Sequence, residues 1–216
     1  MSSRGVIFDM DGVLVDSYAA HLQSWKRLAD ELGEKITEDQ FAATFGRTSR
    51  EIIRELFAVT EGETVARYDA RKEALYRDII RGRVPVMAGA IALVRALHAA
   101  GFRLAVGSSG PPENIALVCE DCGLDETLAG KVSGADVTHG KPHPEVFLLA
   151  AERIGVAPSD CVVIEDAVAG VEAAVRAGMR CIALTSTVGR ERLGQADLVV
   201  DRLDEIDAAV VRRLFA

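Results

Sequence analysis

The sequence has no apolar stretch near the roughly 18 consecutive residues that a membrane-spanning helix needs. It also has no excess of positive charge, because 25 Lys and Arg residues stand against 33 Asp and Glu residues, giving a formal net charge of -8. Such a charge repels nucleic-acid phosphates and anionic membrane surfaces. We therefore expect neither a nucleic-acid nor a membrane partner, and any anionic ligand must be held by local cations.

Cysteine and histidine are scarce, at four residues each. Nothing resembling a secretory signal precedes the first apolar run, so we expect a cytoplasmic protein with reduced thiols. Cys119 and Cys122 are spaced like a metal or redox pair, but no second pair or histidine cluster completes a zinc site with them, and their segment has helical spacing. His98, His139 and His143 match no motif, and we expect them to be solvated or to support other residues.

The chain is long enough, at 216 residues and 49% hydrophobic composition, to bury a full core with or without a small insert. Short apolar runs alternate with segments of helical spacing, and Gly101, Gly155 and Gly178 follow three of those segments, where a left-handed cap residue is expected. This alternation predicts an α/β fold with a mostly parallel sheet and helices on both faces. The apolar runs are Val6–Phe8, Leu104–Val106, Cys161–Ile164, Cys181–Leu184 and Leu198–Val200.

The segment 17–83 breaks this rhythm. It is highly charged, its apolar residues recur with the period of a helix, and it contains no convincing strand. We predict a helical domain at 17–83, inserted into a catalytic core of residues 1–16 and 84–216. The loops at its two ends would let such a domain pivot over the core.

Asp9 and Asp11 follow the first apolar run, and Gly12 then breaks it. Open α/β sheets bind their ligands at the carboxyl ends of the strands. Two neighbouring acids at the end of a buried strand are tolerated only if a cation, a shared proton or solvent offsets their repulsion. We favour a divalent metal ion, so this point is a predicted reaction centre.

Three further polar pieces each end a predicted strand or open a predicted helix. They are Ser108-Ser109-Gly110, Gly140-Lys141-Pro142 and Glu165-Asp166. Each alone also suits an ordinary turn or helix cap, so a functional interpretation depends on their joint occurrence with the two aspartates. In this order, and over essentially the whole chain, the four pieces resemble the four motifs of the haloacid dehalogenase superfamily.

The resemblance implies a Rossmann-like three-layer core with a helical cap inserted just after the first strand. It also implies that Asp9 is a nucleophile that becomes an aspartyl phosphate, and that Asp11 is the acid and base of the reaction. Ser108 and Lys141 would stabilise the charged oxygens of the phosphoryl group in flight. The implied ligands of Mg²⁺ are Asp9, Asp11 through its backbone carbonyl, Glu165 and Asp166.

The helical segment has a closer resemblance, to the β-phosphoglucomutase-like subgroup. The motifs that carry it are Ser17-x-x-x-His21-x-x-x-Trp25, Thr48-Ser49-Arg50-Glu51 and Arg71-Lys72-x-x-x-Tyr76. The implied substrate-binding residues are His21, Trp25, Arg50 and Lys72, and we add Ser109 from the serine motif. Arg50 and Lys72 would supply the cations that a second phosphate needs. Taken singly, each of these residues also suits a helix core or a solvated surface.

The serine motif departs from the mutase pattern. Pro111 and Pro112 stand where the mutase carries a lysine-asparagine pair that helps to grip its substrate. Without that grip, a reorienting bisphosphate intermediate would be held less well, and water would hydrolyse the aspartyl phosphate instead. We therefore predict a Mg²⁺-dependent phosphatase of small sugar phosphates, acting as a monomer or weak homodimer.

Other activities remain open. A β-phosphoglucomutase that works through a bisphosphate is the alternative. A metal-free 2-haloacid dehalogenase and a non-catalytic binding protein are more remote. Asp11 and the Glu165-Asp166 pair argue against the dehalogenase, and the intact acids, serine and lysine argue against the binding protein.

Overall fold

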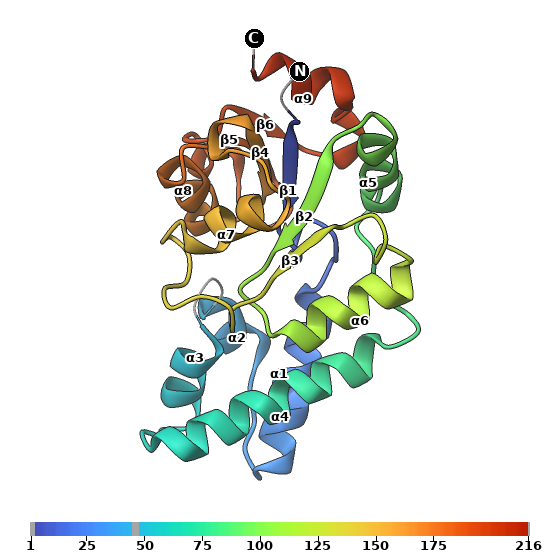
Figure 1. Ribbon diagram of the computed structural model, residues 1–216. Coiled ribbons are helices and arrows are strands. Elements are labelled where there is room, and N and C mark those ends of the chain that lie inside the picture. The colour runs from blue at the N-terminus through green and yellow to red at the C-terminus, as the bar shows by residue number, and fades with distance from the viewer. Residues whose placement is uncertain (1–2, 45–47, 216) are drawn as a thin grey trace. The chain divides into compact units, whose positions relative to one another are not determined.

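A computed structural model describes residues 3–44 and 48–215 of the chain (Figure 1). The chain divides into two compact units. We call Met1–Asp16 with Val84–Ala216 the sheet unit, and Ser17–Arg83 the helical unit. No described helix combines the length and the apolar character that crossing a membrane requires.

The sheet unit contains six strands in the order β3-β2-β1-β4-β5-β6, and every neighbouring pair is parallel. This confirms the predicted α/β fold with a mostly parallel sheet. The register places Val6 beside Leu104 on one side and Val162 on the other. The strands are β1 (Gly5–Phe8), β2 (Arg103–Gly107), β3 (Gly130–Val132), β4 (Cys161–Glu165), β5 (Arg180–Leu184) and β6 (Leu198–Val200).

The strand β3 is absent from the runs that the apolar pattern predicts. It is three residues long and has a glycine and a lysine before its valine, Val132, so it has no apolar run. Its place at the edge of the sheet explains this composition, because an edge strand pairs on one side only and needs less apolar surface.

Helices cover both faces of the sheet, with α7 and α8 on one face and α5 and α6 on the other (Figure 1). Phe147 of α7 is fully buried among residues of β1, β2 and β4, including Ile7, Ala105 and Val163. Replacing such a phenylalanine by alanine typically costs about 3–5 kcal/mol. The helices of this unit are α5 (Ala90–Ala99), α6 (Pro112–Cys122), α7 (Glu145–Arg153), α8 (Val168–Arg176) and α9 (Ala208–Arg213), with short 3₁₀ turns at η1 (Pro158–Asp160), η2 (Arg190–Arg192) and η3 (Leu203–Glu205).

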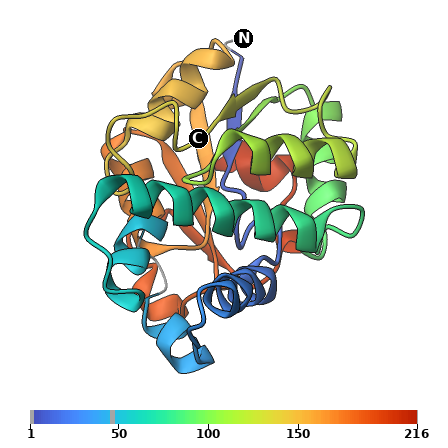
Figure 2. The ribbon, with the colours of Figure 1, turned by 90° about the horizontal axis from the view of Figure 1, so that it is seen from below.

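The helical unit consists of α1 (Tyr18–Glu31), α2 (Glu38–Ala43), α3 (Ser49–Leu56) and α4 (Gly62–Ile80). The helices α1 and α4 pack together, and α3 lies against the N-terminal half of α4 (Figures 1 and 2). The side chains that meet there form a core of their own, which includes Trp25, Leu28, Ile53 and Val65. Among its described residues the unit has no strand, as the helical periodicity predicts.

Two helices of this unit begin at capping boxes. Thr37 and Gln40 bond reciprocally at the start of α2, and Thr48 and Glu51 do so at the start of α3. Each box satisfies amide groups that the first helical turn leaves without partners. Short helices such as these depend on caps, because few internal hydrogen bonds hold them.

Candidate active site

The predicted acids lie at the point in the sheet where the order of strand addition reverses, between β1 and β4. From β1 the chain builds outward to β2 and β3 on one side, and β4, β5 and β6 extend on the other. The crevice outside the carboxyl ends of two such strands is where open α/β sheets bind ligands. Asp9 follows β1 and Glu165 ends β4, and the amide of Asp9 donates to the carbonyl of Ile164 over 2.9 Å. The fold therefore brings together acids that are about 155 residues apart in the sequence.

Lys141 joins two of these acids. Its Nζ donates to Asp9 Oδ1 over 2.5 Å and to Glu165 Oε1 over 2.7 Å. The ammonium also lies 4.7 Å from the centroid of the Phe147 ring, so the core phenylalanine supports it from α7. All three ionic groups are shielded from solvent, which strengthens their attraction.

Both carboxylate oxygens of Glu165 accept hydrogen bonds, and Gly170 lies close beside them. Its Oε2 accepts hydrogen bonds from the amides of Asp166 and Ala167, each over 2.6 Å, just before α8 begins. A Cβ on Gly170 would lie 1.7 Å from Glu165 Oε1, so only glycine leaves room for this carboxylate. Lys141 is therefore paired with an acid whose own position is confined.

Asp166 is buried beside the loop that follows β5. The hydroxyl of Thr187 donates to Asp166 Oδ2, and the hydroxyl of Ser186 lies 3.5 Å from the same oxygen. Ser186 also donates to the carbonyl of Gly12 over 2.6 Å. Gly12 has a φ of +81°, and a Cβ there would lie 1.9 Å from Asp166 Oδ2. The loop after β5 therefore contacts both the turn after β1, at Gly12, and the acid Asp166 that follows β4.

Ser186, Thr187 and Gly170 belong to none of the four sequence motifs. A signal for the two hydroxyls exists, because Thr185-Ser186-Thr187 directly follows the apolar run of β5, as the other site residues follow theirs. Gly170 gives no such signal. A glycine within a helix reveals its role only when the carboxylate beside it is located.

Burial sets the charge states of these acids. It raises the pKa of Asp9 to about 7, with the carboxylates of Glu165 and Asp11 adding to the rise and Lys141 opposing it. Burial likewise raises the pKa of Asp166 well above its usual range, with Glu165 and Asp9 as further causes. For Lys141, burial alone would lower the pKa, but the adjacent Asp9 and Glu165 carboxylates outweigh it and raise the pKa. If all of these acids were ionised, they would carry more negative charge than one lysine offsets, and for this reason their proximity favours the protonated forms.

An oxygen-rich group capable of holding a cation lies here. Asp9, Glu165 and Asp166 each offer a carboxylate oxygen, and these oxygens lie within 4.8 Å of one another. Asp11 is outside this group, and its partly buried backbone lies in a tight turn bridged to Val15.

The serine motif lies at the same edge of the sheet. Ser108 follows β2, is buried, and donates its amide to the carbonyl of Val132 over 3.0 Å. Its hydroxyl accepts from the amide of Gly110 over 3.0 Å, which closes the turn. Ser109 is exposed on this turn.

In the helical unit, three of the four predicted substrate-binding residues form one cluster. Lys72 on α4 is 2% exposed, and its Nζ lies 2.8 Å from His21 Nδ1 and 2.8 Å from Glu73 Oε1. The His21 ring stacks on Tyr76 at 4.1 Å. Trp25 is 1% exposed, and its ring centroid lies 5.3 Å from the ammonium, so the indole supports the lysine from within the core.

Arg50 lies outside that cluster. Its Nε donates to Asp69 Oδ2 over 3.3 Å, and its side chain is largely exposed. Burial raises the pKa of Asp69, and the Arg50 hydrogen bond opposes the rise. Ser49, the neighbour of Arg50, donates to Glu73 Oε1 over 3.3 Å, which links the start of α3 to the cluster. Both predicted phosphate-binding cations therefore already contact a carboxylate.

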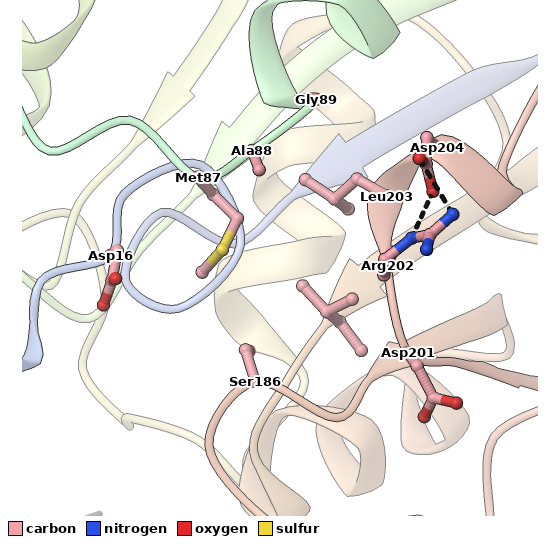
Figure 3. A pocket seen from close by; sticks show the side chains of 10 residues that line it. Asp16, Met87, Ala88, Gly89, Ser186, Asp201, Arg202, Leu203 and Asp204 are labelled. Carbon is pink, nitrogen blue, oxygen red and sulfur yellow. Dashed lines mark hydrogen bonds and ion pairs between the residues drawn. The ribbon is translucent and has the colours of Figure 1, made fainter.

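A cavity of about 350 Å³ opens elsewhere on the sheet unit (Figure 3). The acids of the site do not line it, although Ser186 borders both places. The guanidinium of Arg202 in its wall is paired with Asp204 over 2.9 and 3.1 Å, so its charge is already compensated. The cavity is lined by Asp16, Met87, Ala88, Gly89, Leu184, Ser186, Asp201, Arg202, Leu203 and Asp204.

Comparisons of this chain with family models, curated relatives and solved structures agree on one family. A model of the haloacid dehalogenase-like hydrolases matches residues 4–178. Hexitol phosphatase A of Escherichia coli strain K12 is 33% identical over 206 residues, which cover 95% of this chain and 94% of that protein. β-Phosphoglucomutase of Bacillus subtilis strain 168 is 28% identical over 94% of this chain and 91% of its own. The crystal structure of a HAD hydrolase of family IA, variant 3, from Entamoeba histolytica HM-1:IMSS superposes with a TM-score of 0.88 at 26% identity, covering 100% of this chain and 99% of that one.

Proposed function

The chain belongs to the haloacid dehalogenase-like hydrolases, and on that basis we propose that it is a Mg²⁺-dependent phosphatase of small phosphomonoesters, chiefly sugar phosphates. The observation that carries the proposal is the buried group of Asp9, Glu165 and Asp166 around Lys141 at the switch point of the sheet. The family membership predicted from the motifs is confirmed. The metal, the residue roles and the substrate class are proposals.

The donor set fits Mg²⁺. Three buried carboxylates face a single lysine, and oxygen ligands in a charge-rich site suit this ion, which keeps some of its waters. We assign Asp9, Asp166 and the backbone carbonyl of Asp11 as the protein ligands. Glu165 was predicted as a ligand too, but its Oε1 is paired with the Lys141 ammonium over 2.7 Å, so we assign it the positioning of Lys141. When bound, Mg²⁺ would offset the repulsion between an anionic nucleophile and an anionic phosphate.

The residues then act in a fixed order. The Asp9 carboxylate attacks phosphorus, the bond from phosphorus to the leaving oxygen breaks, and Asp11 gives its proton to that oxygen. Asp11 next removes a proton from water, which attacks the aspartyl phosphate and releases inorganic phosphate and free Asp9. Lys141 and Ser108 stabilise the negative charge on the transferred group, a contribution of about 10²–10³-fold for each well-placed donor in comparable sites.

The ion pairs of the helical unit favour a substrate with one phosphate over an intermediate with two. A bisphosphate intermediate needs, for its second phosphate, positive charge beyond what the neighbouring carboxylates neutralise. Lys72 is paired with Glu73, and Arg50 with Asp69, so each cation proposed for that task has a carboxylate beside it. A balanced polar cluster suits sugar hydroxyls better than a phosphate. The names of relatives such as hexitol phosphatase A also favour hydrolysis.

The test of the proposed chemistry is turnover of p-nitrophenyl phosphate with and without Mg²⁺. We expect activity only with the metal, and a loss of about 10³-fold or more in Asp9→Asn, since the amide cannot act as the nucleophile. Asp39→Asn, an exposed change of the same type on α2, is the matched control and should retain activity. An Asp9→Asn protein as active as the parent would refute the aspartyl phosphate.

The mutase is the second candidate, because β-phosphoglucomutase is among the relatives. The two activities are separated by supplying β-glucose 1-phosphate with a catalytic amount of glucose 1,6-bisphosphate. We expect release of inorganic phosphate to exceed formation of glucose 6-phosphate. The reverse ratio would establish the mutase instead.

A further inference from the structure

Two histidines flank Lys141 and meet at the start of α7. His139 and His143 lie two residues before and two residues after the lysine, and both contact Glu145, the first residue of the helix. Their side chains are 65% and 48% exposed, and that of Glu145 is 30% exposed. None of these three belongs to the acidic group of the active site.

The spacing of the three side chains suits a small transition-metal ion. His139 Nδ1 lies 3.3 Å and His143 Nδ1 lies 3.7 Å from the same oxygen, Glu145 Oε2. The two imidazole rings have centroids 4.7 Å apart. In a tetrahedral zinc site with bonds of about 2.0–2.2 Å, neighbouring ligand atoms lie roughly 3.3–3.6 Å apart. The ligand atoms of the three groups all lie within 4.8 Å of one another, so small shifts of the exposed imidazoles would let the groups surround one ion.

The carboxylate of this group is held in place from behind. Glu145 Oε1 accepts from the amide of Thr138 over 2.9 Å, and Oε2 accepts from the amide of His139 over 3.0 Å. These backbone bonds, with burial opposing them, lower the pKa of Glu145, so the group is ionised at neutral pH. Hydrogen bonds that orient a carboxylate in this way are typical of metal ligands.

We propose that His139, His143 and Glu145 form a second metal site, which takes Zn²⁺ or a similar borderline cation rather than Mg²⁺. Two imidazoles and one carboxylate are preferred ligands of Zn²⁺, whereas Mg²⁺ prefers oxygen. Three protein ligands leave one position for water. The ion ties residues on both sides of Lys141 to α7, and so restrains the segment that presents the lysine to Asp9.

Titration calorimetry with Zn²⁺, on tag-free protein saturated with Mg²⁺, tests this site without measuring turnover. We expect one equivalent of Zn²⁺ to bind the parent chain, and about 100-fold weaker binding in His139→Gln and in His143→Gln. His98→Gln, an exposed histidine on α5, is the matched control and should bind as the parent does. Circular dichroism of each variant verifies that it is folded.

The results that overturn the proposal are specific. Zn²⁺ binding that survives in the double variant His139→Gln/His143→Gln would place the ion elsewhere, at the acidic centre or at thiols. An absence of binding in the folded parent chain would leave the contacts as hydrogen bonds between histidines and a glutamate. Replacement of Zn²⁺ by Co²⁺ gives a second measurement, since the visible absorption of bound Co²⁺ should disappear with either histidine.

Discussion

At the scale of single residues, the candidate active site depends on the close approach of two glycines to two buried carboxylates. Glu165 lies where only glycine is tolerated at position 170, and Asp166 where only glycine is tolerated at position 12. The Glu165 carboxylate therefore has little room to move. Because Lys141 donates to both Glu165 and Asp9, the confined Glu165 helps to place Lys141 beside Asp9. The geometry of the acidic group therefore depends on Gly12 and Gly170, which have no side chain to take part in the proposed chemistry.

Gly170→Ala should disrupt this arrangement. The new methyl group would overlap Glu165 Oε1, so the carboxylate must move and Lys141 must lose a partner. We expect a loss of about 1–3 kcal/mol in the free energy of unfolding from overpacking, and a larger relative loss of kcat than of substrate affinity. Urea unfolding and steady-state kinetics measure the two effects.

Gly194→Ala is the control for this change. A Cβ on Gly194 has no atom of the described residues within 4 Å, so the variant should match the parent in both measurements. If Gly170→Ala also matches the parent, Glu165 is not confined as we describe.

The stabilisation of the protein by Mg²⁺ should depend on pH. Burial raises the pKa of Asp9 to about 7, above its unfolded value of about 3.9, so in the metal-free protein this group destabilises the fold increasingly from about pH 4 to 7. A bound cation removes that cost at high pH, and protons compete with the cation at low pH. We expect Mg²⁺ to raise Tm more at about pH 8 than at about pH 5.

Thermal unfolding with Mg²⁺ or with a chelator, at both pH values, measures this difference. Asp166→Asn removes one proposed ligand and should lose most of the Mg²⁺-dependent rise at either pH. An equal rise at both pH values in the parent would contradict the assignment of Asp9 as a ligand.

At the scale of elements, short helices and short strands are fixed by different means. The helix α3 has eight residues and relies on its cap, in which Thr48 and Glu51 bond reciprocally. The strand β3 has three residues and relies on its neighbour, since Ala105 and Gly107 of β2 pair with Gly130 and Val132. Local chemistry thus makes the helix recognisable in the sequence, whereas the strand becomes recognisable only beside its partner.

Thr48→Ala should destabilise the helical unit. Removing the cap leaves the Glu51 amide without its hydroxyl partner, and the loss is about 1 kcal/mol, within a range of 0.5–2 kcal/mol. Thr60→Ala, an exposed threonine before α4, is the control and should change the free energy of unfolding by less than about 0.5 kcal/mol. Equal effects of the two variants in urea unfolding would show that the cap contributes nothing.

At the scale of the whole molecule, the chain places its two clusters of buried charged residues in different units. The sheet unit contains the complete acidic centre with its lysine, and the helical unit contains the Lys72 cluster around His21 and Glu73. Each cluster is built within its own unit, so each can be changed separately. We propose that the first performs phosphoryl transfer and that the second selects the substrate.

Lys72→Met should therefore change specificity. Removing the ammonium leaves His21 and Glu73 without their shared partner, and we expect kcat/KM for sugar phosphates to fall about tenfold more than kcat/KM for p-nitrophenyl phosphate, which has no sugar to recognise. Glu63→Gln, an exposed change near the start of α4, is the control and should leave this ratio unaltered. A parallel loss on both substrates would rule out a selective role for Lys72.

The sequence by itself determined the class of fold and the motif residues that the structure gathers at one edge of the sheet. Short apolar runs, helical spacing between them and acids directly after a run are local patterns. Because the carboxyl ends of parallel strands meet at one edge of the sheet, residues that follow different strands come close together there. Asp9 and Ser108 directly follow their strands, and the Glu165-Asp166 pair lies at the end of β4, whereas Lys141 comes from the loop before α7. The family assignment made from these motifs is confirmed.

Only the tertiary structure decided which groups contact which. It brought Thr187 to Asp166, assigned the oxygens of Glu165 to Lys141 and two amides, and paired Lys72 with Glu73 and Arg50 with Asp69. The physical reason is that burial, hydrogen bonding and ion pairing act over a few ångströms between residues that are far apart along the chain. No local pattern encodes such a distance, so the charge left available to a ligand becomes known only once the chain is folded.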